Sequence, residues 1–507
     1  MRQNETTSIL PKANESYWRD TGKVPSYGEL KNDLHVDTVV VGAGIAGVMT
    51  AYQLAKAGKE VAVLEARELF SGTSGFTTAK LTAQHNLIYD ELINRYGQET
   101  AKLFYQANME GIASIKELAD QFGIDCELEE REAFVFTQKA ENRNKISKEA
   151  EAYQKLGIEG EFVEDLPLNM EVEAAIMMRN QAQFHPVKFL AGLLEEFVNL
   201  GGKVYDQTKV MDIADKANKT ECTTESGLKV TASQVVQATH LPIIEPESKF
   251  FSKQNNPESS YALAVKTKDE FPDGLYINAD LPKRTLRGLD SKTGRVVLVG
   301  GESHSTGDGK SSSERYKELE SFAKELFEVK EIINRWSAHD YISEDRLPFI
   351  GALSEDQPNV YVVTGLSKWG LAISATGAKI LTDAILEKDN PYKAMFTPER
   401  IIQESISVEP QEENHNHYDD ASEENNPEEL SNNQGMITKR DGEEVGAYKD
   451  ENGNLHYVDL TCTHLGCGVQ WNDGDNTWDC PCHGSRFSGT GEVIEGPAVE
   501  SLKTLNE

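Results

Sequence analysis

Two short boxes near the C-terminus restrict what this chain can fold into more than any other feature. The first reads CTHLGC from Cys462 to Cys467, and the second reads CPCHGS from Cys480 to Ser485. Together they hold two histidines and four of the six cysteines of the chain. The opening residues, MRQNETTSILPKANESYW, show no basic region followed by an apolar run, so we expect no secretory signal and a cytoplasmic protein. Clustered Cys and His in such a protein indicate metal ligands before structural disulfides.

Each box offers one cysteine and one histidine, which is the donor set of a Rieske [2Fe-2S] centre. Cys462 and Cys480 would bind one iron, and His464 and His483 the other, because neutral nitrogen donors raise the potential above that of an all-cysteine cluster. The alternative is a four-cysteine zinc site, but zinc ribbons rarely combine Cys-x-His with Cys-Pro-Cys-His-Gly. We therefore expect a C-terminal all-β Rieske domain over residues 436–507, whose meagre core needs the metal for stability.

The boxes resemble those of the cytochrome bc-type Rieske proteins. In that subset the two remaining cysteines form a disulfide between the loops, which implies a bridge between Cys467 and Cys482 here. Ser485 stands where the subset has a hydroxyl donor to a bridging sulfide, whereas Phe487 stands where it has a second donor, a tyrosine. Because fewer hydrogen bonds to sulfur stabilise the reduced cluster less, we expect a potential below that of respiratory Rieske proteins. Residues 496–498 resemble the loop that covers the cluster.

Residues 37–65 predict one βαβ unit, with a β-branched strand, a Gly-rich turn, a helix and a second strand. The turn carries Gly42, Gly44 and Gly47 as G-x-G-x-x-G, and the strand before it makes this motif informative. The glycines allow the tight turn, the approach of a pyrophosphate and close helix packing, and the helix N-terminus favours the phosphate charge. Glu65 ends the second strand, where an acid accepts hydrogen bonds from ribose hydroxyls. These residues alone leave FAD, NAD and a plain Gly-rich turn open.

The segment VDTVVVGAGIAGVMTAYQLAKAGKEVAVLEAR resembles the N-terminus of the D-amino acid oxidase-like (DAO) superfamily of FAD oxidoreductases, which includes glycine oxidase and sarcosine oxidase. Further likeness in SGTSG, VVQAT, DRLPFIG and GLSKWGL extends the resemblance over roughly residues 35–390. It implies bound FAD and an α/β FAD-binding body of Rossmann type with an inserted α+β substrate domain. The implied organisation is an N-terminal arm, 1–34, and a body, 35–400, whose FAD-binding segments are approximately 35–110, 183–250 and 340–395, with the substrate-domain segments between them.

The same resemblance assigns flavin contacts beyond the Gly-rich turn. These are Arg67, Thr73, Ser74, Val210, Thr239, Gly365, Lys368, Trp369, Gly370 and Leu371. Two features depart from the family. The run that is usually glycine-rich near the flavin reads GFTTAKLTAQH here, and Trp369 stands where smaller residues are common. These departures leave the substrate open. They also leave two interpretations of His85, as a covalent attachment point for flavin or as a plain hydrogen-bonding histidine.

An acidic segment separates the two predicted units. From Ile401 to Thr438 there is no Lys or Arg, and Glu, Asp, Asn and Ser dominate. Such a segment cannot bury enough apolar area to offset its ordering entropy, so residues 401–435 are predicted to be a flexible linker. His415 and His417 within it match a short metal tract, although histidines in a solvated linker usually have no role.

Charge and hydropathy exclude two classes of partner. A formal net charge of -33 repels nucleic acid and anionic lipid headgroups. The uncharged stretch from Thr38 to Ala55 approaches the length of a membrane span, but it holds glycines and polar residues and belongs to the βαβ unit. We therefore expect no nucleic-acid partner and no stable membrane insertion.

The pairing of FAD with a one-electron cluster indicates an oxidoreductase. Flavin takes two electrons as hydride and releases them singly, whereas a [2Fe-2S] cluster accepts one at a time. We predict oxidation of a small amine or amino acid at FAD, with electrons leaving through the cluster to an unidentified acceptor. The alternatives are a flavin reductase that delivers electrons through the cluster to a partner, and a redox sensor. The single dinucleotide fingerprint argues against a second, NAD(P)H-binding Rossmann domain. A Rieske oxygenase is not favoured either, because we find no 2-His-1-carboxylate set for a mononuclear iron in the sequence.

Three residues are candidates for contact with the substrate. Arg287 or Arg284 would clamp a carboxylate, because a guanidinium fork matches it. His304, in GGESHSTG, would act near the flavin. For each, an ordinary structural role is the alternative.

Overall fold

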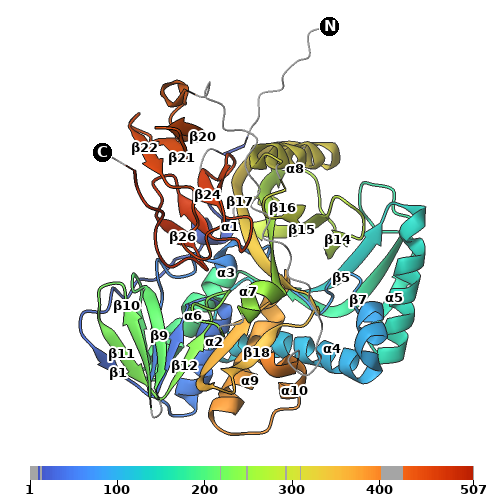
Figure 1. Ribbon diagram of the computed structural model, residues 1–507. Helices are drawn as coiled ribbons and strands as arrows, with labels where there is room; N and C mark the ends of the chain where they lie inside the picture. Colours follow the sequence, from blue (N-terminus) through green and yellow to red (C-terminus); the bar gives the residue numbers. More distant parts are fainter. Residues whose placement is uncertain are drawn as a thin grey trace.

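The Gly-rich turn follows strand β2 (Thr38–Val41), an inner strand of a six-stranded sheet (Figure 1). The computed structural model describes residues 10–11, 14–216, 219–246, 249–291, 294–308, 310–400 and 426–505. The β-branched run Thr38–Val41 (β2) is buried throughout, as expected for a parallel strand covered on both faces. The strand order is β18-β19-β12-β2-β3-β8. The other strands are β3 (Val61–Leu64), β8 (Lys203–Tyr205), β12 (Gln234–Gln237), β18 (Phe349–Ser354) and β19 (Gln357–Thr364).

Helices cover one face of this sheet, and a second sheet covers the other. Ile45–Lys56 (α2) lies against Pro186–Asn199 (α6) and Gly370–Ile385 (α9) on the helical face. Val39 and Val41 point to the opposite face, where they pack with residues of a four-stranded sheet of order β1-β11-β10-β9. Its strands are β1 (Leu34–His35), β9 (Val210–Lys216), β10 (Lys219–Thr224) and β11 (Lys229–Ala232). The predicted Rossmann-type body is confirmed.

A nine-stranded, largely antiparallel sheet forms the second part of the body. Its strands are β4 (Lys80–Leu81), β5 (Glu129–Thr137), β6 (Gly160–Val163), β7 (Ala174–Gln183), β13 (Asn255–Thr267), β14 (Leu275–Asn278), β15 (Arg284–Ser291), β16 (Gly294–Ser305) and β17 (Val329–Ser343). The accompanying helices are α4 (Tyr89–Gln121), α5 (Arg143–Leu156) and α8 (Ser312–Leu326). This is the predicted α+β unit, and β4 and β17 bring parts of the predicted FAD-binding segments into it. Short helices and 3-10 turns complete the body: α3 (Thr73–Phe76), α7 (Phe250–Gln254), α10 (Lys393–Phe396), η1 (Ala140–Asn142) and η2 (Pro398–Arg400).

The C-terminal module is all-β, as predicted, and lies beside β17 and α8 (red in Figure 1). One sheet contains β20 (Gln434–Arg440), β21 (Glu443–Lys449) and β22 (Leu455–Val458). The other contains β23 (Gln470–Asn472), β24 (Thr477–Asp479), β25 (Arg486–Ser488) and β26 (Val493–Glu495). Its small core includes Cys462, Cys480 and the fully buried Trp478, so the sulfur ligands are part of the packing.

The described part of the predicted N-terminal arm packs on the body. Tyr17–Thr21 (α1) begins at the N-cap Ser16, and Trp18 is fully buried and donates its indole N–H to the carbonyl of Thr77 at 2.7 Å. Most of the predicted linker, together with His415 and His417, lies outside the described residues, and the described end holds the short turn η3 (Pro427–Glu429). Among the described helices, none combines the length and the apolar character needed to span a bilayer.

Candidate functional site

The Gly-rich turn leaves room for a phosphate group against the backbone. Gly42 has a positive φ of 101°, and a Cβ there would lie 2.5 Å from the carbonyl oxygen of Ala238. A Cβ on Gly47 would lie 1.9 Å from the carbonyl oxygen of Gly42, so this glycine allows α2 to approach the turn. Gly44 is the N-cap of α2 and provides no capping side chain. The helix therefore presents its N-terminus to the space beyond, as a pyrophosphate site requires.

Glu65 stabilises the turn from the end of β3. Its carboxylate accepts hydrogen bonds from the backbone N–H of Ala43 at 2.8 Å and of Arg67 at 3.2 Å. Burial raises the pKa of Glu65, although these hydrogen bonds oppose the shift. The side chain also lines the cavity described next, where free carboxylate lone pairs suit ribose hydroxyls.

A cavity of about 880 Å³ extends from the turn into the large sheet. This volume lies near the upper end of the range for ligand pockets. All but one of the residues predicted to contact FAD line it, and the exception is Gly47, which lies beneath the turn. The lining residues are Gly42, Gly44, Glu65, Arg67, Thr73, Ser74, Val210, Thr239, Gly365, Lys368, Trp369, Gly370 and Leu371. Segments far apart in the sequence thus meet at one extended site that fits a dinucleotide.

The loop before α9 forms one wall of this cavity. Gly365 adopts a positive φ of 67°, and Lys368 pairs with Glu258 at 2.9 Å. Trp369 stacks on His85, with ring centroids 5.2 Å apart and an interplanar angle of 7°. His85 is nearly fully buried and its Nε2 lies 3.2 Å from the carbonyl oxygen of Thr82, which fits the hydrogen-bonding interpretation. Covalent attachment of flavin at this residue stays a prediction.

The C-terminal boxes bring four candidate ligands together. The rings of His464 and His483 lie 4.9 Å apart, and both Nδ1 atoms are buried without a hydrogen-bond partner. Burial lowers the pKa of His464 to about 4, so its imidazole is a neutral donor. The Cys462 and Cys480 thiols are buried and interact, and contact with Cys480 lowers the pKa of Cys462 to about 7. Two buried, unpartnered imidazole nitrogens and two free cysteine sulfurs from the same two boxes fit the donor set of a Rieske cluster.

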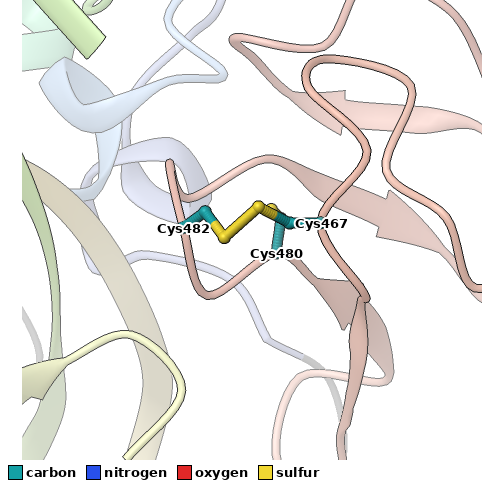
Figure 2. A group of neighbouring side chains, drawn as sticks. All are labelled: Cys467, Cys480 and Cys482. Carbon is teal, nitrogen blue, oxygen red and sulfur yellow. A yellow bond between two sulfur atoms is a disulfide. The ribbon is translucent and has the colours of Figure 1, made fainter. Parts of the chain in front are cut away.

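The other two cysteines of the boxes form the predicted disulfide, between Cys467 and Cys482. Figure 2 shows this bridge beside Cys480. The three sulfur atoms lie close together, but the bridge removes two of them from the metal donors. The Ser485 hydroxyl contacts Cys462 and accepts a hydrogen bond from the N–H of Ala498 at 3.0 Å. This places a hydroxyl at the ligand sulfur.

Comparisons with known proteins identify both units. The family described as FAD dependent oxidoreductase (DAO) matches residues 37–384. The chain belongs to this family. The Rieske [2Fe-2S] domain family matches residues 423–506. The protein is thus a DAO-type FAD oxidoreductase with a C-terminal Rieske domain, and its cofactors are FAD and a Rieske [2Fe-2S] cluster.

Three relatives illustrate the similarity. The Rieske 2Fe-2S iron-sulfur protein YhfW of Bacillus subtilis is 40% identical over 501 residues, which cover 98% of each chain. The gamma-glutamylputrescine oxidoreductase of Escherichia coli is 23% identical over 386 residues, covering 73% of this chain and 88% of that one. The crystal structure of glycine oxidase from Geobacillus kaustophilus has a TM-score of 0.61 at 20% identity and covers 72% of this chain and 98% of its own. This last likeness establishes the shared DAO fold.

A lysine that the sequence analysis did not single out lines the cavity of the DAO body. Lys80, in β4, donates from Nζ to the Thr285 hydroxyl at 2.6 Å, and Nζ lies 5.4 Å from the centroid of the Trp369 ring. Burial, together with the charge of Arg287, lowers the pKa of Lys80 to about 7. The sequence around Lys80 carries a signal that could have identified this residue, because Lys80 is the one charged residue in the run from Ser71 to Tyr89.

The candidate substrate residues take different places. Arg284 lines the cavity, and so does its neighbour Lys283, but Arg284 is paired with the buried Glu302 at 2.5 Å. Arg287 is not among the lining residues, since its guanidinium lies over the Trp18 ring and donates to the carbonyl of Ala79 at 2.6 Å.

His304 also lies off the cavity wall. Its Nε2 is 3.1 Å from the Tyr261 hydroxyl, and its Nδ1 is 3.3 Å from the carboxylate of Asp308. The segment that follows contacts the Rieske domain, because a Cβ on Gly307 would lie 2.3 Å from that of Pro481. The structure therefore brings Arg284 to the cavity and leaves Arg287 and His304 outside it.

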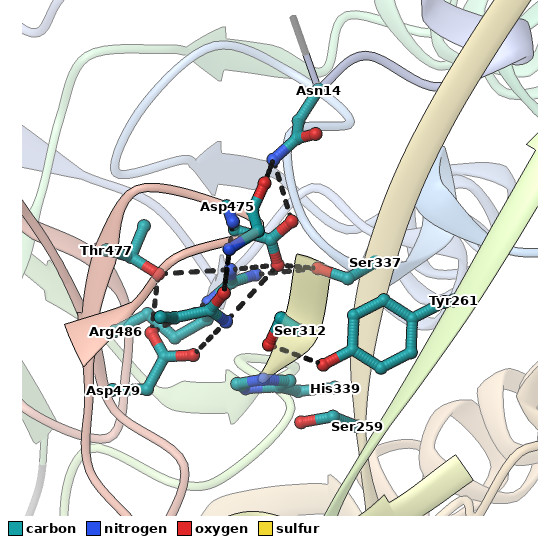
Figure 3. A network of polar contacts seen from close by, with 12 residues as sticks. Asn14, Ser259, Tyr261, Ser312, Ser337, His339, Asp475, Thr477, Asp479 and Arg486 are labelled. Carbon is teal, nitrogen blue, oxygen red and sulfur yellow. Dashed lines mark hydrogen bonds and ion pairs between the residues drawn. The ribbon is translucent and has the colours of Figure 1, made fainter. Parts of the chain in front are cut away.

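The Rieske domain is fixed to the body by a buried polar network, which we call the docking cluster: Asn14, Tyr316, Ser337, Asp475, Asp479 and Arg486. Figure 3 shows all of these residues except Tyr316 with labels. Asp475 is the centre of the docking cluster. It accepts hydrogen bonds from Asn14 at 2.7 Å and from Tyr316 at 3.0 Å, and also from the Ser337 hydroxyl. Arg486 pairs with Asp475 at 2.8 Å and with Asp479 at 3.3 Å. Body and domain thus share one set of buried charges.

Residues of the Rieske domain also close part of the cavity. The segment 493–499 lines it together with residues of the Gly-rich turn. Within this segment Glu495 lies 3.7 Å from His240, a cavity residue of the body. The loop that resembles a cover of the cluster therefore also borders the FAD cavity, a placement that the sequence alone did not indicate.

Proposed function

We propose that this protein oxidises a small amine or amino acid at FAD and passes the electrons one at a time through the Rieske cluster to an external acceptor. The observation that carries the proposal is the shared wall, because residues of the Rieske domain line the same cavity as the Gly-rich turn. The DAO relative named gamma-glutamylputrescine oxidoreductase and the fold shared with a glycine oxidase support amine chemistry.

Residues on the cavity wall suit the FAD that the family implies. We assign the pyrophosphate to the turn at Gly42 and Gly44, the ribose to Glu65, and the ring system to the wall formed by Lys368 and Trp369. When bound, FAD supplies the two-electron acceptor for the hydride that leaves the carbon next to nitrogen. The C–N single bond of the substrate becomes C=N, and its nitrogen loses a proton.

The side chains of the cavity provide the proton acceptor and the anion site. Lys80, with its pKa near 7, takes the proton of a substrate ammonium group, since a neutral amine close to the reacting atoms acts as a general base. Lys283 adds positive charge to the same cavity, which favours a carboxylate on the substrate, and Arg284 lies beside it with its charge partnered by Glu302. This arrangement favours an amino acid over a simple amine.

The neutral imidazoles of His464 and His483 and the thiolates of Cys462 and Cys480 hold the cluster in our assignment. Histidine ligation raises the potential of a [2Fe-2S] centre, which makes the cluster a better electron acceptor. When bound, the cluster would accept electrons from reduced FAD one at a time, so two of them would have to pass for each substrate oxidised.

Anaerobic reduction tests the proposal. Purified holoenzyme is mixed in turn with a panel of amines and amino acids, with NADH and with NADPH, while FAD bleaching is followed by absorbance and cluster reduction by EPR. We expect an amino acid to bleach FAD and to produce the EPR signal of the reduced cluster. Bleaching by NADH or NADPH alone would overturn the proposal in favour of a flavin reductase, and reduction by none of these donors would favour a redox sensor.

A further inference from the structure

Next to the wall that segment 493–499 forms, strand β17 lies between the FAD cavity and the second Cys-His box. Side chains of a strand alternate between its two faces. On one face lie four residues that line the cavity: Trp336, Ala338, Asp340 and Ile342. On the other face lie three residues that hydrogen-bond to the Rieske domain: Ser337, His339 and Tyr341. At this point a single strand lies between the two cofactor sites.

Tyr341 reaches the Rieske domain at a ligand of the cluster. Its hydroxyl donates to the carbonyl of His483 at 2.7 Å and lies 3.3 Å from the carbonyl oxygen of Gly496. The residue is only 2% exposed, so bulk water does not replace these hydrogen bonds. The second box and the loop at residues 496–498 thus converge on one hydroxyl of the body.

The other end of Tyr341 contacts the wall of the FAD cavity. Its backbone carbonyl accepts a hydrogen bond from the N–H of Ser367 at 3.0 Å, and Ser367 lines the cavity in the loop before Lys368. Its ring packs edge-on against His240, another cavity residue, with centroids 4.6 Å apart. One residue therefore joins the cavity wall to the backbone of a cluster ligand.

His339 makes a second contact of the same kind. Two residues before Tyr341 and on the same face of β17, its Nδ1 lies 3.3 Å from the carbonyl oxygen of Gly484, the residue after His483. Consecutive carbonyls of the second box are therefore held by alternate residues of one strand.

We propose that electrons pass between FAD and the cluster across β17, and that Tyr341 is the positioning residue that holds His483 against this strand. The inference rests on the proposed function, because it takes reduced FAD as the electron donor. Each transfer moves one electron from reduced FAD to the oxidised cluster. Two transfers restore oxidised FAD, its protons pass to water, and a one-electron acceptor outside the chain takes the electrons in turn.

The test compares two buried tyrosines in the full-length holoenzyme, one at the interface and one away from it. Tyr341→Phe removes the hydrogen bond to the carbonyl of His483, whereas Tyr276→Phe removes one to the carbonyl of Asp273 in the body. FAD is reduced by a laser flash with deazariboflavin, and transfer to the cluster is followed by absorbance and freeze-quench EPR. The midpoint potential of the cluster is measured separately by EPR-monitored titration.

We expect Tyr341→Phe to slow transfer roughly two- to tenfold, the change that one lost hydrogen bond corresponds to, and to shift the midpoint potential. Tyr276→Phe should leave both quantities at the wild-type values. Equal rates in wild type and Tyr341→Phe, or equal slowing by both variants, would overturn the inference. If Tyr341→Phe does not retain the cluster, His339→Leu applies the same test to the Gly484 contact, and an unchanged transfer rate would then reject β17 as the route. A wild-type cluster that stays oxidised after the flash would instead reject the proposed function.

Discussion

Replacing Arg486 by methionine should destabilise the contact between the Rieske domain and the body. Arg486 is 10% exposed and pairs with two carboxylates, Asp475 at 4% and Asp479 at 10% exposure. The substitution keeps most of the side-chain volume but leaves two buried carboxylates without their cation. Removing one partner of a buried ion pair costs about 3–5 kcal/mol, and we expect a loss of this size in the free energy of unfolding.

The pH dependence follows from the same contact. Burial raises the pKa of Asp479, but Arg486, together with hydrogen bonds from Asn472 and Thr477, holds the pKa below its usual value. A carboxyl with a lowered pKa in the folded state stabilises the protein above the pKa of the unfolded chain, and this stability is lost as the pH falls below about 4. In Arg486→Met the pKa of Asp479 rises, so we expect acid unfolding to begin at a higher pH.

Guanidinium unfolding measures the effect, with visible circular dichroism of the cluster reporting the Rieske domain and flavin absorbance reporting the body. Arg179→Met is the matched control, because Arg179 also pairs with two carboxylates, Glu132 and Glu161, but is 47% exposed. Exposed pairs of this kind contribute about 0–1 kcal/mol. Equal losses in Arg486→Met and Arg179→Met would refute the claim that the docking cluster stabilises the domain.

Three further substitutions test the cofactor and substrate assignments. Lys80→Met should lower the rate of FAD reduction by the amine substrate about 10²- to 10⁴-fold. It should also remove the rise in this rate near pH 7, because the neutral amine of Lys80 forms above its pKa, and stopped-flow pH profiles with an unchanged inflection would show that another group is the base. Glu65→Ala should raise the dissociation constant of FAD roughly 10- to 100-fold through lost ribose hydrogen bonds, and fluorescence titration with an unaltered constant would contradict the ribose assignment. Phe487→Tyr should raise the cluster potential by adding a donor near sulfur, and redox titration of this variant against wild type would expose a wrong assignment by showing no increase.

The sequence predicted the parts of the fold whose signals are local. The run Thr38–Val41, the glycines after it and Glu65 lie close together in the chain, so their chemistry is visible without a structure. The same holds for the two boxes, whose ligand spacing indicated the Rieske domain and whose resemblance to the cytochrome bc-type proteins implied the disulfide between Cys467 and Cys482.

Residues whose role depends on long-range packing could not be placed in this way. Arg284 and Arg287 are equivalent as carboxylate clamps in the sequence, but only the packing of α1 shows that Trp18 covers the second. Lys80 stands out in the sequence as a lone charge, but its contact with Thr285 and its lowered pKa arise only when β4 and β15 bury it. The docking of one domain on another likewise leaves no short motif to detect.

The alternation of side chains along β17 makes the length of this strand a constraint on the whole protein. A single inserted or deleted residue between Trp336 and Ile342 would exchange the two sets of side chains, turning Asp340 toward the iron centre and Tyr341 toward the flavin. Individual residues on either face can change separately, so substrate preference and cluster environment can diverge independently among homologues. The number of residues between these positions cannot change in the same way, so we expect homologues to have no insertions or deletions in this stretch of β17.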